Sequence, residues 1–186
     1  MKYISYSIAW PFIKLFMFLY KPVIIGKENI SKKGAILAGN HKSVLDPLLI
    51  ISSTTKHINF FAKKEIFKPI IKYLFINAGV ISVDRKSKNK ESISKGIKKL
   101  NNNELVCIFP EGTTSKDGNL LPFKYGAVSM AKKTNSLICP FIIKGNYRLF
   151  KKNIKLIYLK PYNLTDDLDK ENNKLKNLIE KELKSE

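Results

Sequence analysis

Cysteine and histidine are scarce in this sequence, with two of each among 186 residues. Both cysteines lie inside apolar runs, Cys107 in LVCIF and Cys139 in LICPF, where a thiol behaves as a small hydrophobic side chain with a raised pKa. No C-x-x-C pair and no Cys/His metal spacing occurs, so the cysteines indicate neither zinc nor redox chemistry. We expect two reduced core cysteines, and a domain of this length needs no disulfide to fold.

Arginine and acidic residues are scarce as well, because only Arg85 and Arg148 stand among 34 basic residues, against 15 acidic ones. The net charge of +19 predicts an attraction to polyanions, either nucleic acid or an anionic membrane surface. Base-edge recognition relies on forked arginine contacts, and most aromatic residues here lie in apolar runs, so nucleic acid is disfavoured. A solvated surface without any partner is the other interpretation of the same lysines.

No apolar run is long enough for a comfortable membrane span, but the segment from Ile4 to Tyr20 is apolar and rich in aromatic residues. Pro11 and Lys14 interrupt it, and it lacks the small residues of a signal-peptide cleavage site. Residues with an apolar body and a polar tip suit the headgroup level, and they are Tyr3, Tyr6, Trp10 and Tyr20. We expect residues 1–22 to form a membrane-associated segment, an interfacial helix being favoured over a true span or a core helix.

The rest of the chain alternates short β-branched runs with longer helical patterns. This rhythm predicts an α/β fold with a mostly parallel central sheet flanked by helices. Strands are expected at Ala35–Ala38, Ile58–Phe61, Val80–Val83, Leu105–Phe109, Leu137–Ile143 and Ile154–Leu159, and helices at Pro47–Ser52, Glu65–Asn77, Asn89–Asn101, Tyr125–Thr134 and Asp166–Lys184. No repeat or linker marks a second domain, so residues 23–186 are expected to form one catalytic domain.

Three polar clusters directly follow expected strands. They span residues 39–43 (GNHKS), 84–86 (DRK) and 111–115 (EGTTS). Ligands of a parallel sheet collect at the carboxyl ends of its strands. All three clusters are therefore candidates for one cleft.

His41 and Asp46 form a candidate catalytic pair, five residues apart. Pro47 favours an extended or turn conformation at Asp46 and a helix that starts at Pro47, so a tight turn can fold the carboxylate onto the imidazole. A carboxylate on one ring nitrogen fixes the tautomer and leaves the other nitrogen free to accept a proton. The alternative is that Asp46 is only a helix N-cap and His41 a turn residue.

Four sequence blocks follow one another in the chain, at residues 40–46 (NHKSVLD), 80–85 (VISVDR), 109–115 (FPEGTTS) and 138–141 (ICPF). Together they resemble the glycerolipid acyltransferase family, whose N-H-x-S-x-x-D signature the first block matches. The intervening AKKEIF and PFKYGA also match, so the resemblance runs from about Gly26 to Gly145. Four ordered blocks are far more specific than any one of them.

The resemblance implies direct acyl transfer from acyl-CoA or acyl carrier protein to the free hydroxyl of 1-acyl-glycerol-3-phosphate, giving phosphatidate in phospholipid biosynthesis. No cofactor, no metal and no acyl-enzyme is implied, and the thioester is a co-substrate. His41 is then the base, Asp46 its orienting partner, and Asn40 helps to shape the turn. The resemblance implies that the acceptor is bound by Asn40, Asp84, Arg85, Glu111, Gly112, Thr113, Lys124 and Gly126. Its phosphate needs cationic donors and a close backbone approach, which Arg85, Lys124 and the two glycines can supply.

One departure from the family pattern concerns the acceptor. Thr114 stands where the family usually has arginine, so a forked phosphate contact is missing. Arg85 and Lys124 are left to hold the phosphate, with Lys42 as a further cation, or else the acceptor is a different lyso-lipid.

Other classes of protein fit the residues less well. A metal-dependent hydrolase would have to gather His41, Asp46, His57 and Glu111, none of which has a compact ligand spacing. Serine hydrolysis lacks a G-x-S-x-G elbow. The main alternative is a non-catalytic basic membrane-binding module. We expect the protein at the cytoplasmic face of a membrane, where lysines are attracted to the anionic surface that holds lysophospholipids.

Overall fold

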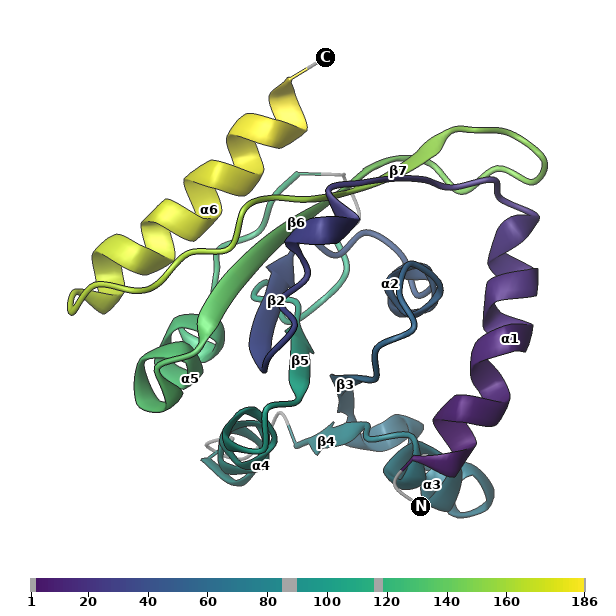
Figure 1. The fold of residues 1–186 in the computed structure, drawn as a ribbon, viewed down its shortest axis with the longest axis horizontal. Helices are drawn as coiled ribbons and strands as arrows, with labels where there is room; N and C mark the ends of the chain where they lie inside the picture. The colour runs from purple at the N-terminus through teal and green to yellow at the C-terminus, as the bar shows by residue number, and fades with distance from the viewer. Residues whose placement is uncertain (1–2, 85–89, 116–118, 186) are drawn as a thin grey trace.

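A seven-stranded sheet organises the computed structural model, which describes residues 3–84, 90–115 and 119–185 (Figure 1). Its strand order is β1-β7-β6-β2-β5-β3-β4. The strands are β1 Val23–Ile25, β2 Ala35–Gly39, β3 Ile58–Lys63, β4 Ile81–Val83, β5 Leu105–Ile108, β6 Leu137–Gly145 and β7 Ile154–Tyr158. The helices are α1 Ile4–Phe18, α2 Asp46–Ser52, α3 Pro69–Asn77, α4 Lys90–Asn101, α5 Gly126–Thr134 and α6 Leu168–Lys184, with short 3-10 turns η1 Lys27–Asn29 and η2 Lys64–Ile66.

The strands β6, β2, β5, β3 and β4 run parallel, which confirms the predicted mostly parallel α/β fold. β2 is buried along its whole length, as a short apolar strand in the middle of a covered parallel sheet should be. Its side chains alternate between two cores, Leu37 facing one and Ile36 the other. Helices α1 and α2 cover the first face and α4, α5 and α6 the second (Figure 1).

The sheet departs from the prediction at one edge. β7 pairs antiparallel with β6, and β1, which the sequence did not predict, pairs parallel with β7. Three residues with partial exposure give β1 too short a pattern to detect. β6 and β7 pair antiparallel because only a short loop joins them, whereas a parallel pair would need a longer crossover connection.

Several helix boundaries also differ from the prediction, and α5 begins one residue later than expected, at Gly126, and α6 two residues later, at Leu168. The helix expected at Glu65–Asn77 begins at Pro69, because Lys68 precedes proline and is extended, with φ −60° and ψ 151°. Residues 64–66 form η2 instead. The helix expected from Pro47 begins one residue earlier, at Asp46. Asn89, the expected start of α4, lies outside the described residues.

Both cysteines are free and fully buried, as predicted. Burial raises the pKa of Cys139 to about 12 and that of Cys107 well above its usual range. These thiols are therefore packing residues of the first core.

Helix α1 is apolar on two opposite faces. Its inner face buries Tyr6 and Met17, whereas Ile8, Phe12 and Leu15 are 61–69% exposed on the outer face. Over the described part of the chain, no helix combines the length and the hydropathy that a bilayer crossing requires.

The polar tips of α1 were expected at a lipid interface, and several of them instead bind the protein. Trp10 Nε1 donates to the carbonyls of Ile51 and Thr54, at 3.2 and 2.8 Å. Tyr6 Oη donates to the carbonyl of Lys56, and Tyr3 Oη to the Glu104 carboxylate. The polar groups of these three aromatic residues therefore face the protein.

Candidate active site

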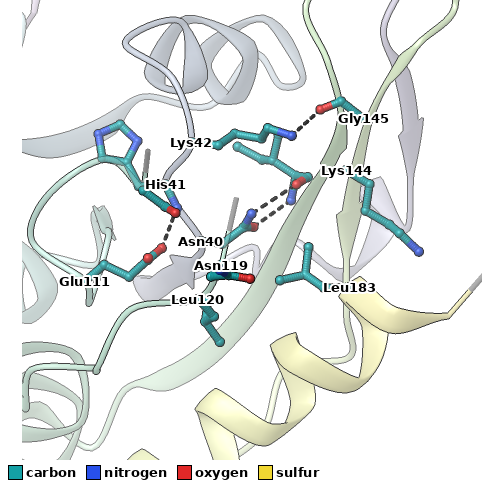
Figure 2. Close-up of a pocket in the computed structure, with 11 residues that line it drawn as sticks. Asn40, His41, Lys42, Glu111, Asn119, Leu120, Lys144, Gly145 and Leu183 are labelled. Carbon is teal, nitrogen blue, oxygen red and sulfur yellow. Dashed lines mark hydrogen bonds between the residues drawn. The ribbon is translucent and has the colours of Figure 1, made fainter. Parts of the chain in front are cut away.

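The turn that follows β2 is held by backbone and side-chain contacts with β6. A Cβ on Gly39 would lie 2.2 Å from the carbonyl oxygen of Phe141, so only glycine fits there. The buried side chain of Asn40 donates to the Ile143 carbonyl at 3.0 Å and accepts from the Ile143 N–H at 2.8 Å (Figure 2). These contacts place the next residue, His41, at the carboxyl end of the central strand.

His41 and Asp46 are in direct contact. His41 Nδ1 lies 2.8 Å from Asp46 Oδ2, which also accepts hydrogen bonds from the N–H groups of Lys42 and Ser43, at 2.7 and 2.8 Å. Asp46 is fully buried, and the helix N-cap is Leu45, which makes no side-chain cap bond. The carboxylate therefore points back to the turn and the imidazole, and Nε2 is the ring nitrogen directed away from it.

Tyr147, in the loop between β6 and β7, completes the shell around Asp46. Its hydroxyl donates to Asp46 Oδ1 at 2.7 Å, and its ring packs edge-on against Tyr20, which follows α1. Burial, followed by the charge of Asp46, raises the pKa of Tyr147, so the phenol remains a donor. Sequence reasoning missed this residue, because it lies 101 positions from Asp46 and after the fourth block.

Phe109, the first residue of the third block, fixes the plane of the imidazole. The two rings are stacked, with centroids 4.0 Å apart and an interplanar angle of 17°. Phe109 in turn packs edge-on against Phe141 of β6. Stacking and the bond to Asp46 together restrict His41 to one orientation.

Glu111 lies in the loop after β5, and its side chain contacts the loop after β2. Its carboxylate accepts hydrogen bonds from the N–H groups of His41 and Leu121, at 2.8 and 2.9 Å, and the side chain is buried. Burial raises the pKa of Glu111, whereas these two N–H donors act in the opposite direction. Glu111 therefore contacts His41 at its backbone N–H and not at its imidazole ring.

Two further predicted residues, Gly112 and Lys124, lie close together. A Cβ on Gly112 would lie 2.8 Å from Lys124 Nζ, so this lysine passes directly over the glycine beside Glu111. Thr113 is exposed, and Gly126 is the first residue of α5.

Of the predicted cluster at residues 84–86, the structure describes Asp84, which does not join His41. Asp84 forms an ion pair with Lys64 at 3.2 Å. It follows β4, three strands from β2, which corresponds to roughly 14 Å across the sheet. Arg85 lies outside the described residues.

A cavity of about 140 Å³ opens beside His41. Figure 2 shows it between His41 and Glu111 on one side and Lys144 and Leu183 on the other. The Lys42 ammonium reaches across to the carbonyl of Gly145. Two lysines and several polar groups therefore line this space and suit an anionic group better than an apolar one, whereas the His41 imidazole points away from the other lining residues in Figure 2.

The metal-hydrolase arrangement does not form. His57 precedes β3, at the opposite edge of the sheet, where it stacks on Tyr3 with centroids 3.6 Å apart. Within the described ranges, no three His, Cys, Asp or Glu side chains are grouped to hold a metal ion. The geometry around His41 is that of a general base, an imidazole oriented by a buried carboxylate.

Comparison with known proteins finds a family model and relatives that match most of the chain. The family model described as Acyltransferase matches residues 21–144. Two relatives named 1-acyl-sn-glycerol-3-phosphate acyltransferase, from Borreliella burgdorferi and Cocos nucifera, are each 34% identical to the chain, over 146 and 169 residues. The matches cover 76% and 84% of the chain but 58% and 54% of the relatives, so the chain spans a little over half of their length.

A solved structure shares the fold. It is the crystal structure of the 1-acyl-sn-glycerophosphate (LPA) acyltransferase PlsC from Thermotoga maritima, which matches with a TM-score of 0.78 at 23% identity. The match covers 96% of this chain and 79% of that one.

Proposed function

Because the chain belongs to the Acyltransferase family, we propose that it moves a fatty acyl group from acyl-CoA or acyl carrier protein to the free hydroxyl of 1-acyl-glycerol-3-phosphate. The product is phosphatidate, and no further cofactor takes part. The observation that carries the proposal is the 2.8 Å contact between His41 Nδ1 and the buried Asp46 carboxylate. The names of the relatives from Borreliella burgdorferi and Cocos nucifera supply the acceptor.

In the proposed mechanism, His41 Nε2 accepts the proton of the acceptor hydroxyl. The hydroxyl oxygen then attacks the thioester carbonyl, so that a C–O bond forms and the C–S bond breaks. The imidazolium returns its proton to the departing thiolate, and Asp46 stabilises the imidazolium in the meantime. A general base of this kind contributes about 10²–10⁴-fold in rate.

The acceptor phosphate is proposed to lie on the cationic side of the site. Lys124 over Gly112 and Lys42 beside the cavity supply donors among the described residues. Arg85 is proposed as a further phosphate contact, and Asp84, Glu111 and Thr113 as parts of the acceptor site. Thr114 donates only a neutral hydrogen bond, which leaves another lyso-lipid as the alternative acceptor.

Arg85→Ala should raise the KM for the acceptor far more than the KM for the acyl donor, because it removes a fixed cation from the phosphate. Steady-state kinetics with each substrate varied in turn measures the two constants. Lys133→Ala, which removes an exposed charge on α5, serves as the control for general electrostatic attraction. Equal changes in both constants would count against a role of Arg85 in acceptor binding.

Tyr147→Phe should lower kcat roughly tenfold and leave both KM values nearly unchanged, because Asp46 loses one buried hydrogen bond. The control is Tyr158→Phe, which removes a more deeply buried hydroxyl that bonds to Ser53 and not to Asp46. The Tm measured by thermal unfolding should fall by similar amounts in both variants.

A double-mutant cycle separates positioning from packing. In an Asp46→Asn background, Tyr147→Phe should cost little further activity, since the group that it positions is gone. Additive losses would show that Tyr147 acts on stability alone.

The apolar outer face of α1 is proposed to lie on a membrane. A helix that is apolar on two opposite faces requires a second partner besides the core, and Ile8, Phe12 and Leu15 on the outer face of α1 are 61–69% exposed in the described structure. On this proposal residues 1–22 form the membrane-associated segment and residues 23–186 the catalytic domain. The lysine-rich surface would hold the chain at an anionic, cytoplasmic leaflet.

The test of the proposed function is an acyl-transfer assay with purified protein in mixed micelles. Labelled acyl-CoA and acyl carrier protein are offered separately, with lysophosphatidate or other lyso-lipids as acceptors. Transfer to lysophosphatidate supports the proposal and identifies the donor. Transfer only to another lyso-lipid would reassign the acceptor, and no transfer by folded protein would favour a non-catalytic membrane-binding module.

A further inference from the structure

The loop between β6 and β7 displays two large apolar side chains. Leu149 is 52% and Phe150 is 65% exposed. Phe150 has a φ of 60°, in the left-handed region that an aromatic residue rarely adopts. This conformation is held by a hydrogen bond from the Phe150 N–H to the carbonyl of Leu19, at 2.6 Å. The loop therefore presents an apolar tip that nothing in the described structure covers.

The tip lies beside the carboxyl end of α1, as Figure 1 shows for the turn of the β6–β7 hairpin. The exposed outer face of α1 includes Leu15 and Phe18, both 68% exposed. The two apolar surfaces thus belong to the same side of the molecule. A partner that covers one of them also reaches the other.

The charges around the tip point to the chemistry of that partner. Arg148 precedes the apolar pair and Lys151 and Lys152 follow it, and all three side chains are exposed. Cations that flank a small apolar insertion match an anionic lipid surface, where the apolar groups enter and the cations stay among the headgroups. A second copy of the chain, with a net charge of +19, would be repelled from this side.

We propose that the β6–β7 loop is a second lipid-contacting element, which inserts Leu149 and Phe150 into an anionic bilayer beside α1. The inference rests on the proposed membrane association of α1, because the two elements share one surface. Tyr147 in the same loop contacts Asp46, so the insertion places the candidate base next to the layer that holds the lyso-lipid hydroxyl.

The experiment places a fluorophore on the tip of the full-length protein. Both native cysteines are buried, so Phe150→Cys provides the accessible thiol for labelling. The vesicles contain equal parts of phosphatidylcholine and phosphatidylglycerol. The matched control is Tyr125→Cys, because Tyr125 is 48% exposed at the start of α5, on the side of the sheet opposite to α1. We expect a blue shift and quenching by brominated lipids at position 150 and neither effect at position 125.

A second measurement uses unlabelled protein in vesicle flotation. Leu149→Ser combined with Phe150→Asn should weaken binding roughly tenfold or more, because two apolar side chains no longer leave water. Asparagine tolerates the left-handed conformation, so the loop is retained. Tyr125→Ser should bind like the wild type.

Several outcomes would overturn the inference. Wild-type flotation by the double variant, or equal fluorescence at positions 125 and 150, would remove the loop from the lipid surface. A label at position 150 that responds to protein concentration without vesicles would assign the tip to self-association. Flotation of the double variant Phe12→Ser with Leu15→Ser tests the contribution of α1 separately. Flotation does not depend on acyl transfer. Failure of the loop, of α1 or of acyl transfer can therefore be told apart.

Discussion

Replacing His41 by alanine should lower kcat for acyl transfer by about 10²–10⁴-fold, the contribution of a positioned general base. The residual rate should no longer respond to Asp46→Asn, because that residue acts through the imidazole. Initial rates at saturating thioester and acceptor measure both effects. The fold should survive, since the His41 side chain lies at the surface of the site and is 17% exposed.

Asp46→Asn is the sharper companion variant. It keeps the size of the side chain, but an amide cannot accept hydrogen bonds at both of its ends from Lys42, Ser43 and Tyr147 as the carboxylate does. We expect a loss of kcat comparable to that of His41→Ala, with circular dichroism unchanged. Substantial activity in both variants would remove the His41–Asp46 pair from the mechanism.

Gly39→Ala should strongly destabilise the fold. The new Cβ would lie 2.2 Å from the Phe141 carbonyl oxygen and 2.4 Å from its ring, so β2 and β6 would have to separate. We expect a free energy of unfolding lower by about 3 kcal/mol or more. In a chain of this size, that corresponds to a Tm roughly 6–12 °C lower.

Gly126→Ala is the matched control for that variant. Its Cβ would meet only the ends of two side chains, Ile108 Cδ1 at 3.0 Å and Ile93 Cδ1 at 3.6 Å. Alanine also favours the helix that begins there, by up to about 1 kcal/mol. Calorimetry should show a small change of either sign. An equally small change for Gly39→Ala would mean that β2 and β6 are less closely packed than the structure shows.

The sequence was sufficient to predict the parallel strands of the sheet and that the loops after β2 and β5 meet. Apolar runs such as residues 35–38 and 105–109 carry strong local patterns, and parallel strands place their carboxyl ends together. For this reason the turn with His41 and the loop with Glu111 could be expected to meet, and they do, through a 2.8 Å hydrogen bond. The same rule failed for Asp84, because it does not say how many strands separate two loops.

Other features depend on contacts between distant residues that leave no local pattern. The antiparallel pairing of β7 with β6 follows from a short loop, and β1 is defined only by its pairing with β7. In the sequence, nothing distinguishes Tyr147 from the other aromatic residues, because only the fold brings it into contact with Asp46. Phe109 is an apolar strand residue in the sequence, yet its ring is stacked on the imidazole.

The contact of Tyr147 with both Asp46 and Tyr20 has a consequence for how such chains can be recombined. Tyr20 follows α1, whereas Tyr147 and Asp46 belong to the part of the chain that surrounds His41. A chimera that takes its first 22 residues from a relative would replace the ring that supports Tyr147. Positions 20 and 147 should therefore be exchanged as a pair, and we expect them to vary together among related sequences.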